Sequence, residues 1–276
     1  MVAATRPDAA PIREAATVVL VRDGRAGIEV FMLRRSHRLV FTPGAYVFPG
    51  GAVDASDRDP AAAACCVGRD DAGASRVLGV ADGGLAYWVA AVRECFEEAG
   101  VLLARDARDR ALGFGDPLTD ARFRRHRDLL NARRRTIADI CAGESVRLDV
   151  APIHYFAHWL TPHPAPRRYN TRFFVVEVPA EQPPLHDDGE AVDGLWVRPE
   201  DALARWPGEA ELIRPTRECL AAFTRFATAG DLLGTVAAMG RVPDAQPRMG
   251  ADGNGVRVLL PGDDGWAAAA AQAGDG

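Results

Sequence analysis

The 276-residue chain lacks features that would place it in several other classes of protein. No apolar run approaches the roughly 18 residues that a membrane-spanning helix needs, and the N-terminus has no unbroken apolar segment typical of a signal peptide. Basic residues are not in excess, because 33 Lys and Arg against 38 Asp and Glu give a formal net charge of −5. General binding of nucleic acid requires surplus positive charge. We therefore expect neither a membrane nor a nucleic acid as partner.

Cysteine pairs and targeting signals are also lacking. The five cysteines include no C-x-x-C pair, so neither a zinc knuckle nor a disulfide framework is expected. The C-terminus carries no targeting tripeptide. Hydrophobic residues make up 48% of the chain and charged residues 26%, which are ordinary values for a globular protein. These features predict a folded protein of a reducing compartment, the cytoplasm.

Hydrophobic periodicity predicts strands early in the chain and more helices late. Apolar runs at 15–22 and 28–34 predict a hairpin that turns at Asp23-Gly24. The clearest helix covers residues 85–99, because apolar residues recur every three or four positions and Gly100 can end it. This order indicates an α+β or mixed α/β protein. The other expected elements are strands at 46–48, 152–161, 171–178, 191–197 and 256–261, and helices at 118–141, 199–205 and 209–228.

Three glutamates gather on one side of the helix predicted at 85–99. At about 100° per residue, Glu94, Glu97 and Glu98 share an arc of roughly 100° opposite the apolar stripe. Like charges so close repel one another, and the C-terminus of a helix disfavours anions, so local stability does not explain the cluster. A hard divalent cation would explain it, because Mg²⁺ prefers carboxylate oxygens and can activate water beside a phosphate. The alternative is a solvated acidic face in which Arg93 pairs with Glu97.

A glycine-rich turn precedes this helix, in the sequence Phe48-Pro49-Gly50-Gly51. Two consecutive glycines allow positive φ angles and let the backbone approach a ligand closely. On its own the segment is equally compatible with an ordinary loop turn.

Together, the turn and the acidic helix resemble the Nudix box, Gx5Ex7REUxEExGU, in which U is a bulky apolar residue. Residues 93–101, RECFEEAGV, match its second half completely. In the first half, Gly51 is followed after five residues by Asp57, where the pattern has Glu. The arginine then comes at position 93 instead of 65, which is an insertion of 28 residues. A box interrupted in this way resembles the peroxisomal coenzyme A diphosphatase type of Nudix hydrolase.

Several segments outside the box resemble the same type. Coenzyme A-cleaving members carry the motif R-S-x3-R-x3-G-x3-FPGG, in which Arg35, Ser36 and Gly44 hold their places and Val40 stands where the second Arg is expected. Further similar segments are residues 44–51, 158–162, 167–174 and 259–263.

The resemblance implies an α+β fold, the Nudix α/β/α sandwich with a mixed β-sheet, a helical insertion in the box and extra C-terminal helices. The implied domain arrangement is a flexible tail at 1–14, a Nudix hydrolase domain at 15–205 with the insertion at 58–84, a helical extension packed on it at 206–264, and a flexible tail at 265–276.

The resemblance also implies a metal-dependent hydrolase that cleaves the diphosphate of coenzyme A or acyl-coenzyme A to 3′,5′-ADP and (acyl-)phosphopantetheine. Mg²⁺ or Mn²⁺ would be held by Glu94, Glu97 and Glu98, and Arg93 would orient a metal-binding glutamate. The group that polarises the attacking water would be a box glutamate, such as Glu97 or Glu98, or Glu190 in a later loop.

Arginines and the glycine turn are the candidates for substrate contact, since a guanidinium can bind phosphate through two hydrogen bonds. Surface solvation is the alternative for the arginines at 167, 168 and 172. The seven arginines between 122 and 135 are expected to form a solvated helix face, with contact to an anionic ligand as the alternative. The predicted substrate-binding residues are Gly50, Gly51, Arg35, Arg167, Arg168 and Arg172.

Two other functions remain open at this point. One is a Nudix pyrophosphatase for ADP-ribose, dinucleotides or nucleotide sugars. The other is a nucleotide-sensing regulator that has the Nudix fold but no catalytic activity. The intact box glutamates argue against this alternative. In each case the expected partner is a small-molecule nucleotide diphosphate, and a homodimer is left open.

Overall fold

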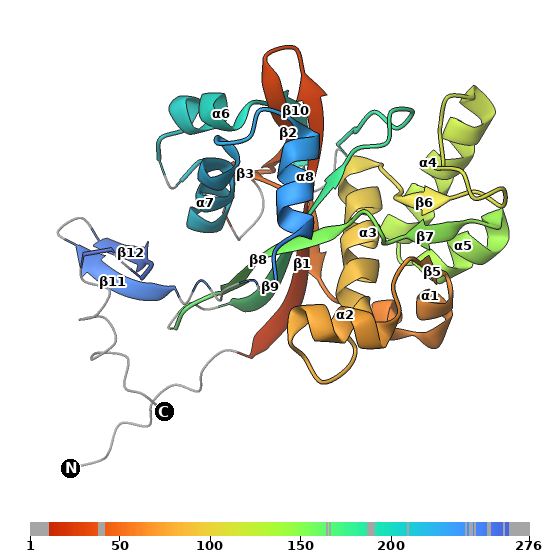
Figure 1. The fold of residues 1–276 in the computed structure, drawn as a ribbon, viewed down its shortest axis with the longest axis horizontal. Helices are drawn as coiled ribbons and strands as arrows, with labels where there is room; N and C mark the ends of the chain where they lie inside the picture. The colour runs from red at the N-terminus through yellow and green to blue at the C-terminus, as the bar shows by residue number, and fades with distance from the viewer. Residues whose placement is uncertain are drawn as a thin grey trace.

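The computed structural model describes residues 11–37, 42–163, 165, 167–186, 191–208, 210–240, 242, 245, 247–252, 255–261, 263 and 264. A seven-stranded mixed β-sheet lies between two groups of helices (Figure 1). This confirms the α+β class and the α/β/α sandwich with a mixed sheet. Among the described helices, none is long and apolar enough to cross a membrane.

The central sheet has the strand order β10-β2-β1-β9-β8, with β3 paired to β2 and β4 paired to β1. β1 runs antiparallel to β2 and parallel to β9. The strands are β1 (Ile12–Gly24), β2 (Gly27–Arg35), β3 (Tyr46–Val47), β4 (Gly50–Ala52), β8 (His154–Leu160), β9 (Arg168–Glu177) and β10 (Ala191–Val197).

β1 is buried on both faces. Val18 and Leu20 belong to the core on one side of the sheet, and Val19 and Val21 belong to the core on the other. Because helices cover both faces, the strand reads as a continuous apolar run instead of an alternation of apolar and polar residues.

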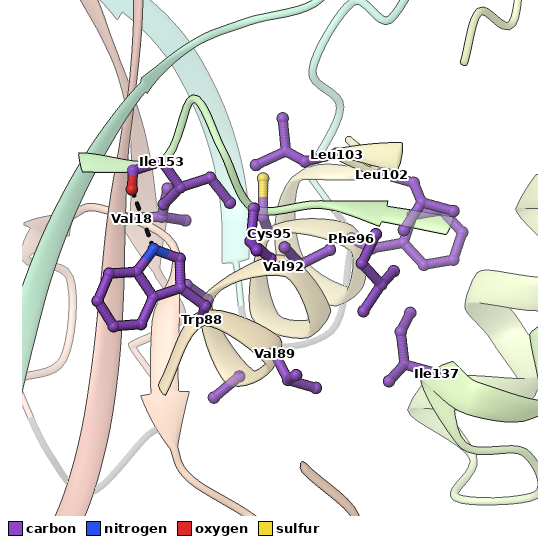
Figure 2. Packing of buried hydrophobic residues seen from close by; sticks show 14 of the residues in the cluster. Val18, Trp88, Val89, Val92, Cys95, Phe96, Leu102, Leu103, Ile137 and Ile153 are labelled. Atoms are coloured by element: carbon purple, nitrogen blue, oxygen red, sulfur yellow. Dashed lines mark hydrogen bonds between the residues drawn. The ribbon is translucent and has the colours of Figure 1, made fainter. Parts of the chain in front are cut away.

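Helix α3 (Leu85–Ala99) packs on one face of the sheet and has the bounds predicted from the sequence. It ends at Gly100, which adopts the left-handed conformation with φ 70°. Its side chains contact Val18 of β1 and reach toward Ile137, and the Trp88 indole donates a 2.9 Å hydrogen bond to the Ile153 carbonyl (Figure 2). Thirteen of its fifteen residues are buried, and the two exceptions are Glu97 and Glu98. The acidic side is therefore the open side of this helix.

The layer that covers α3 includes the segment inserted in the box. Residues 58–84 carry two short helices, and strand β5 of this segment pairs in parallel with β7, so the insertion is part of a second, three-stranded sheet. This confirms the helical insertion. The elements of this layer are η1 (Ala55–Arg58), α1 (Pro60–Ala64), β5 (Cys66–Val67), α2 (Asp71–Leu78), β6 (Ala104–Arg105), α4 (Pro117–Asn131), α5 (Ile137–Glu144) and β7 (Arg147–Asp149).

Three later helices cover the opposite face of the sheet (Figure 1). Leu220, Phe223 and Leu232 join the core there with Val19 and Val21 of β1. The helices are α6 (Pro199–Arg205), α7 (Arg214–Phe223) and α8 (Ala229–Ala237), and a separate hairpin follows with β11 (Arg248–Asp252) and β12 (Gly255–Leu259).

The differences from the sequence prediction include two helices and the start of β1. The helix expected at 118–141 is two helices, because Arg133 adopts the left-handed conformation with φ 54° and Thr136 caps a new helix. The helix expected at 209–228 is shorter, and Thr228 caps a further helix that the periodicity did not indicate. β1 begins at Ile12, inside the tail expected at 1–14, while residues 1–10 and 265–276 lie outside the described residues.

Candidate active site

A pocket of about 650 Å³ opens between β4 and the acidic side of α3. It is lined by residues of β4, by the box residues of α3 and by the turn between α4 and α5. The structure thus brings six predicted site residues to one pocket: Gly50, Gly51, Arg93, Glu94, Glu97 and Glu98.

Arg93 holds the acidic residues in place. Its side chain is 5% exposed, and Nη1 donates to Glu94 Oε1 at 2.7 Å and to Glu97 Oε2 at 2.9 Å. Nη2 donates to the carbonyl of Ala52 at 2.8 Å, which ties α3 to β4. Burial lowers the pKa of Arg93, but the hydrogen bond to Asp57 and the charges around it outweigh burial and raise the pKa above its ordinary value. The side chain therefore stays charged.

Asp57 completes the binding of this guanidinium. Its carboxylate is fully buried and accepts two hydrogen bonds of 2.8 Å, from Nε and Nη2 of Arg93. Such two-point pairing fixes the orientation of the guanidinium plane. Asp57 occupies the box position where the pattern has Glu, and it is not among the residues that line the pocket. Its place in the structure is behind the acidic cluster, as the support of Arg93.

The two glycines of the turn are required by close packing. A Cβ added to Gly51 would lie 2.5 Å from Glu94 Oε1, and one added to Gly50 would lie 2.6 Å from the carbonyl oxygen of Ala16. The Gly50 amide donates to Glu98 Oε2 at 2.9 Å. Neither glycine has a positive φ, so the conformational freedom that the sequence suggested is not what these positions use. They allow the backbone of β4 to approach the glutamates.

Burial raises the pKa of two of the glutamates. The pKa of Glu94 rises to about 7, because burial and the charge of Glu97 outweigh the opposing effect of Arg93. Burial also raises the pKa of Glu97. One guanidinium therefore does not fully compensate the carboxylates gathered around it, and added positive charge would stabilise them.

The donor set of this pocket fits a hard divalent cation. Arg93 bonds one oxygen of Glu94 and one of Glu97, which leaves the second oxygen of each carboxylate for another ligand. Within the described residues, no group of three or more His, Cys, Asp or Glu side chains is arranged as a ready metal cage. Mg²⁺ does not need such a cage, since it takes one or two carboxylates and completes its shell with water and substrate phosphates.

The predicted arginines lie elsewhere. Arg35, Arg167, Arg168 and Arg172 are absent from the lining of this pocket. Arg168 donates to the Thr161 carbonyl at 3.0 Å. Glu190, the candidate base in the later loop, lies outside the described residues.

Arg172 is not a solvated surface residue. It is 7% exposed, and Nη1 donates to the hydroxyl of Tyr155 at 3.1 Å. Its guanidinium also lies 5.9 Å from the ring centre of Tyr87. Surface solvation is therefore wrong for this arginine, and contact with substrate stays a prediction for it.

The seven arginines between 122 and 135 do not form one group in the structure. Arg122 pairs with Glu144 and Arg124 pairs with Asp120, as a solvated helix face would. The arginines at 133, 134 and 135 are exposed as expected, but they follow the end of α4 and line the pocket, so one continuous helix face is wrong for them. The signal was present in the three consecutive arginines followed by a Thr-x-x-Asp sequence, which is typical of a helix start.

Comparison with a solved structure identifies the class of protein. The crystal structure of a Nudix hydrolase from Alicyclobacillus acidocaldarius superposes with a TM-score of 0.65 at 29% sequence identity, covering 82% of this chain and 97% of that chain. The fold, together with the box residues in one pocket, defines a Nudix protein.

The particular family follows from the sequence comparisons. The family described as NUDT19 Nudix domain matches residues 70–217, which is more than half of the chain, and the chain belongs to this family. The acyl-coenzyme A diphosphatase NUDT19 of Gallus gallus is 30% identical over 246 residues, covering 74% of this chain and 65% of that protein. The protein of the same name from Homo sapiens is 31% identical over 209 residues, covering 64% of this chain and 55% of that protein. The chain thus spans less than two thirds of the length of these relatives.

Proposed function

We propose that the chain is a metal-dependent Nudix hydrolase that cleaves the diphosphate of coenzyme A or acyl-coenzyme A to 3′,5′-ADP and (acyl-)phosphopantetheine. The observation that carries the proposal is the buried Arg93, which gathers Glu94 and Glu97 at the base of one pocket. The names of the two relatives as acyl-coenzyme A diphosphatases support the substrate.

The cofactor is Mg²⁺ or Mn²⁺, held by Glu94, Glu97 and Glu98. A divalent cation at this place supplies charge neutralisation for a diphosphate and lowers the pKa of bound water. The three glutamates are suited to bind this cation because they line one pocket, and Arg93 holds two of them close together. Arg93 is a positioning residue, since its hydrogen bonds set the orientation of Glu94 and Glu97.

Hydrolysis adds water to one phosphorus and breaks one bridging P–O bond, so two phosphate monoesters leave and one proton must be accepted. A carboxylate of the box, Glu97 or Glu98, accepts that proton in the proposed reaction, with Glu190 as the other candidate. Glu97 and Glu98 are suited to the task because they are the open positions of α3. Gly50 orients one of them through its amide. The predicted substrate contacts of Gly51, Arg35, Arg167, Arg168 and Arg172 stay part of this proposal.

The proposal includes a small-molecule partner and a reducing compartment, the cytoplasm. A homodimer remains an open part of the proposal.

The test is identification of products by mass spectrometry from a panel of coenzyme A, acyl-coenzyme A, ADP-ribose, dinucleotides and nucleotide sugars, each with Mg²⁺ and with Mn²⁺. We expect 3′,5′-ADP from the coenzyme A substrates. Turnover of ADP-ribose with inert coenzyme A would overturn the substrate class. Saturable binding without product under either ion would replace the enzyme with a nucleotide-sensing protein.

A further inference from the structure

Three consecutive arginines line the same pocket as the glutamates. Arg133, Arg134 and Arg135 lie in the turn between α4 and α5, and we name residues 133–135 the basic turn. All three are exposed. Arg133 approaches Asp54 at 3.3 Å with 83% of its side chain exposed, and the Arg134 side chain makes no hydrogen bond or ion pair with any described residue. Of the three, Arg134 therefore presents to the pocket a positive charge that no described carboxylate pairs with, while Arg133 pairs with Asp54.

The preceding helix fastens the basic turn next to the catalytic pocket. Near the end of α4, Arg127 Nε donates to the backbone carbonyl of Glu97 at 2.9 Å. Asn131 Nδ2 approaches the same carbonyl at 3.4 Å. The turn begins two residues after Asn131, so its position relative to the acidic residues is set by direct contacts with α3.

The turn itself is held by backbone bonds. The amide of Arg133 donates to Leu130 O at 2.8 Å and the amide of Arg134 donates to Leu129 O at 2.8 Å. On the other side, Thr136 and Asp139 form a capping box at the start of α5. The turn that carries the arginines is therefore fixed on one side by backbone hydrogen bonds and on the other by a helix cap.

Arg133 occupies a conformation that does not favour an arginine. Its φ is 54°, at the position after a helix end where glycine or asparagine is preferred. An unfavourable backbone conformation at a pocket is typical of a residue kept for its side chain. Here the side chain adds a third positive charge to the same side of the pocket.

We propose that the basic turn binds a phosphate monoester of the substrate, separate from the diphosphate that is cleaved. The diphosphate belongs at the carboxylates, where a cation would neutralise it, while a second phosphate in the same pocket would need its own positive partner. A monoester carries close to two negative charges at neutral pH, and guanidinium groups bind it through paired, charge-assisted hydrogen bonds. The identification of this group as the 3′-phosphate of coenzyme A rests on the proposed function.

The experiment compares coenzyme A with 3′-dephospho-coenzyme A in the wild type, Arg134→Ala and Arg125→Ala. Arg125 is an exposed arginine of α4 outside the pocket lining, and serves as the matched control. We expect Arg134→Ala to raise KM for coenzyme A by about tenfold, the cost of one lost charge-assisted bond, with kcat unchanged. KM for the dephosphorylated substrate and both KM values of Arg125→Ala should stay at wild-type levels. Circular dichroism confirms that each variant is folded.

The outcomes separate the two proposals. If Arg134→Ala changes KM equally for both substrates, or for neither, the phosphate assignment is overturned. The proposed function still holds in that case, because the coenzyme A substrates are cleaved. If no diphosphate is cleaved, the proposed function fails, and calorimetric binding of 3′,5′-ADP against 5′-AMP decides the phosphate assignment. The phosphate assignment is supported if the wild type and Arg125→Ala bind 3′,5′-ADP more tightly than 5′-AMP and Arg134→Ala does not. It is overturned if the wild type binds the two nucleotides equally.

Discussion

The two sides of the pocket are built in opposite ways. On the acidic side, a buried guanidinium cross-links the carboxylates: the Arg93 side chain is 5% exposed and bonds Asp57, Glu94 and Glu97. The basic turn is exposed, and its arginines make few bonds within the described residues. A buried network sets the geometry before a ligand arrives, whereas an exposed group adapts to the ligand and contributes mainly to affinity. Substitutions on the acidic side should therefore change kcat and stability, and those on the basic side should change KM.

The largest expected effect is on kcat. Glu97→Gln removes a carboxylate charge while keeping the shape of the side chain, so kcat should fall by about 1000-fold with the melting temperature within a few degrees of the wild type. Steady-state kinetics and a thermal melt check this. Glu177→Gln, at an exposed position of β9, should retain full activity. Full activity of Glu97→Gln would remove this glutamate from the site.

The next effect is on stability. Asp57→Asn leaves the buried guanidinium without its two-point partner and should reduce the free energy of unfolding by about 3 kcal/mol. Urea unfolding measures it. Asp120→Asn breaks the exposed pair with Arg124 and should cost less than about 1 kcal/mol. Equal losses in the two variants would mean that the buried pair has no special role.

A smaller loss is expected at the glycine turn. Gly51→Ala places a methyl group 2.5 Å from Glu94 Oε1, so the glutamate must shift, and kcat/KM should fall by about 100-fold. Gly234→Ala in α8 is the control, because nothing lies within 4 Å of the added Cβ. A fully active Gly51→Ala would show that the position of Glu94 is not critical.

The smallest effect is expected on the basic turn, where one substitution should increase the stability of the protein but weaken substrate binding. Arg133→Gly removes the strain of the left-handed conformation but increases the conformational entropy of the unfolded chain. The net effect should be a stabilisation of about 0.5 kcal/mol. KM for the substrate should rise, because the arginine side chain is lost. Ser145→Gly relieves the same conformation, φ 53°, at the end of α5, and should stabilise the protein without changing KM. A change of KM in both variants would mean that it comes from the backbone and not from the arginine.

Sequence alone predicts the parts of the site that depend on local spacing. The helix at 85–99 and its acidic side follow from a periodicity that the structure reproduces residue for residue. The bond between Asp57 and Arg93 could not be derived in this way, because 36 positions separate the two residues. The turn that carries the arginines at 133–135 was not predicted for another reason. Its arginines extend the pattern of an exposed helix, and the left-handed residue that turns the chain there is an arginine, not the glycine that would have marked the break.

The ion pair between Asp57 and Arg93 has a consequence for the segment inserted in the box. It joins the chain immediately before the insertion to the helix that follows it. The ion pair thereby ties the acidic site to both ends of the interruption. A long insertion can thus be accommodated within the box while its two halves remain joined in one site.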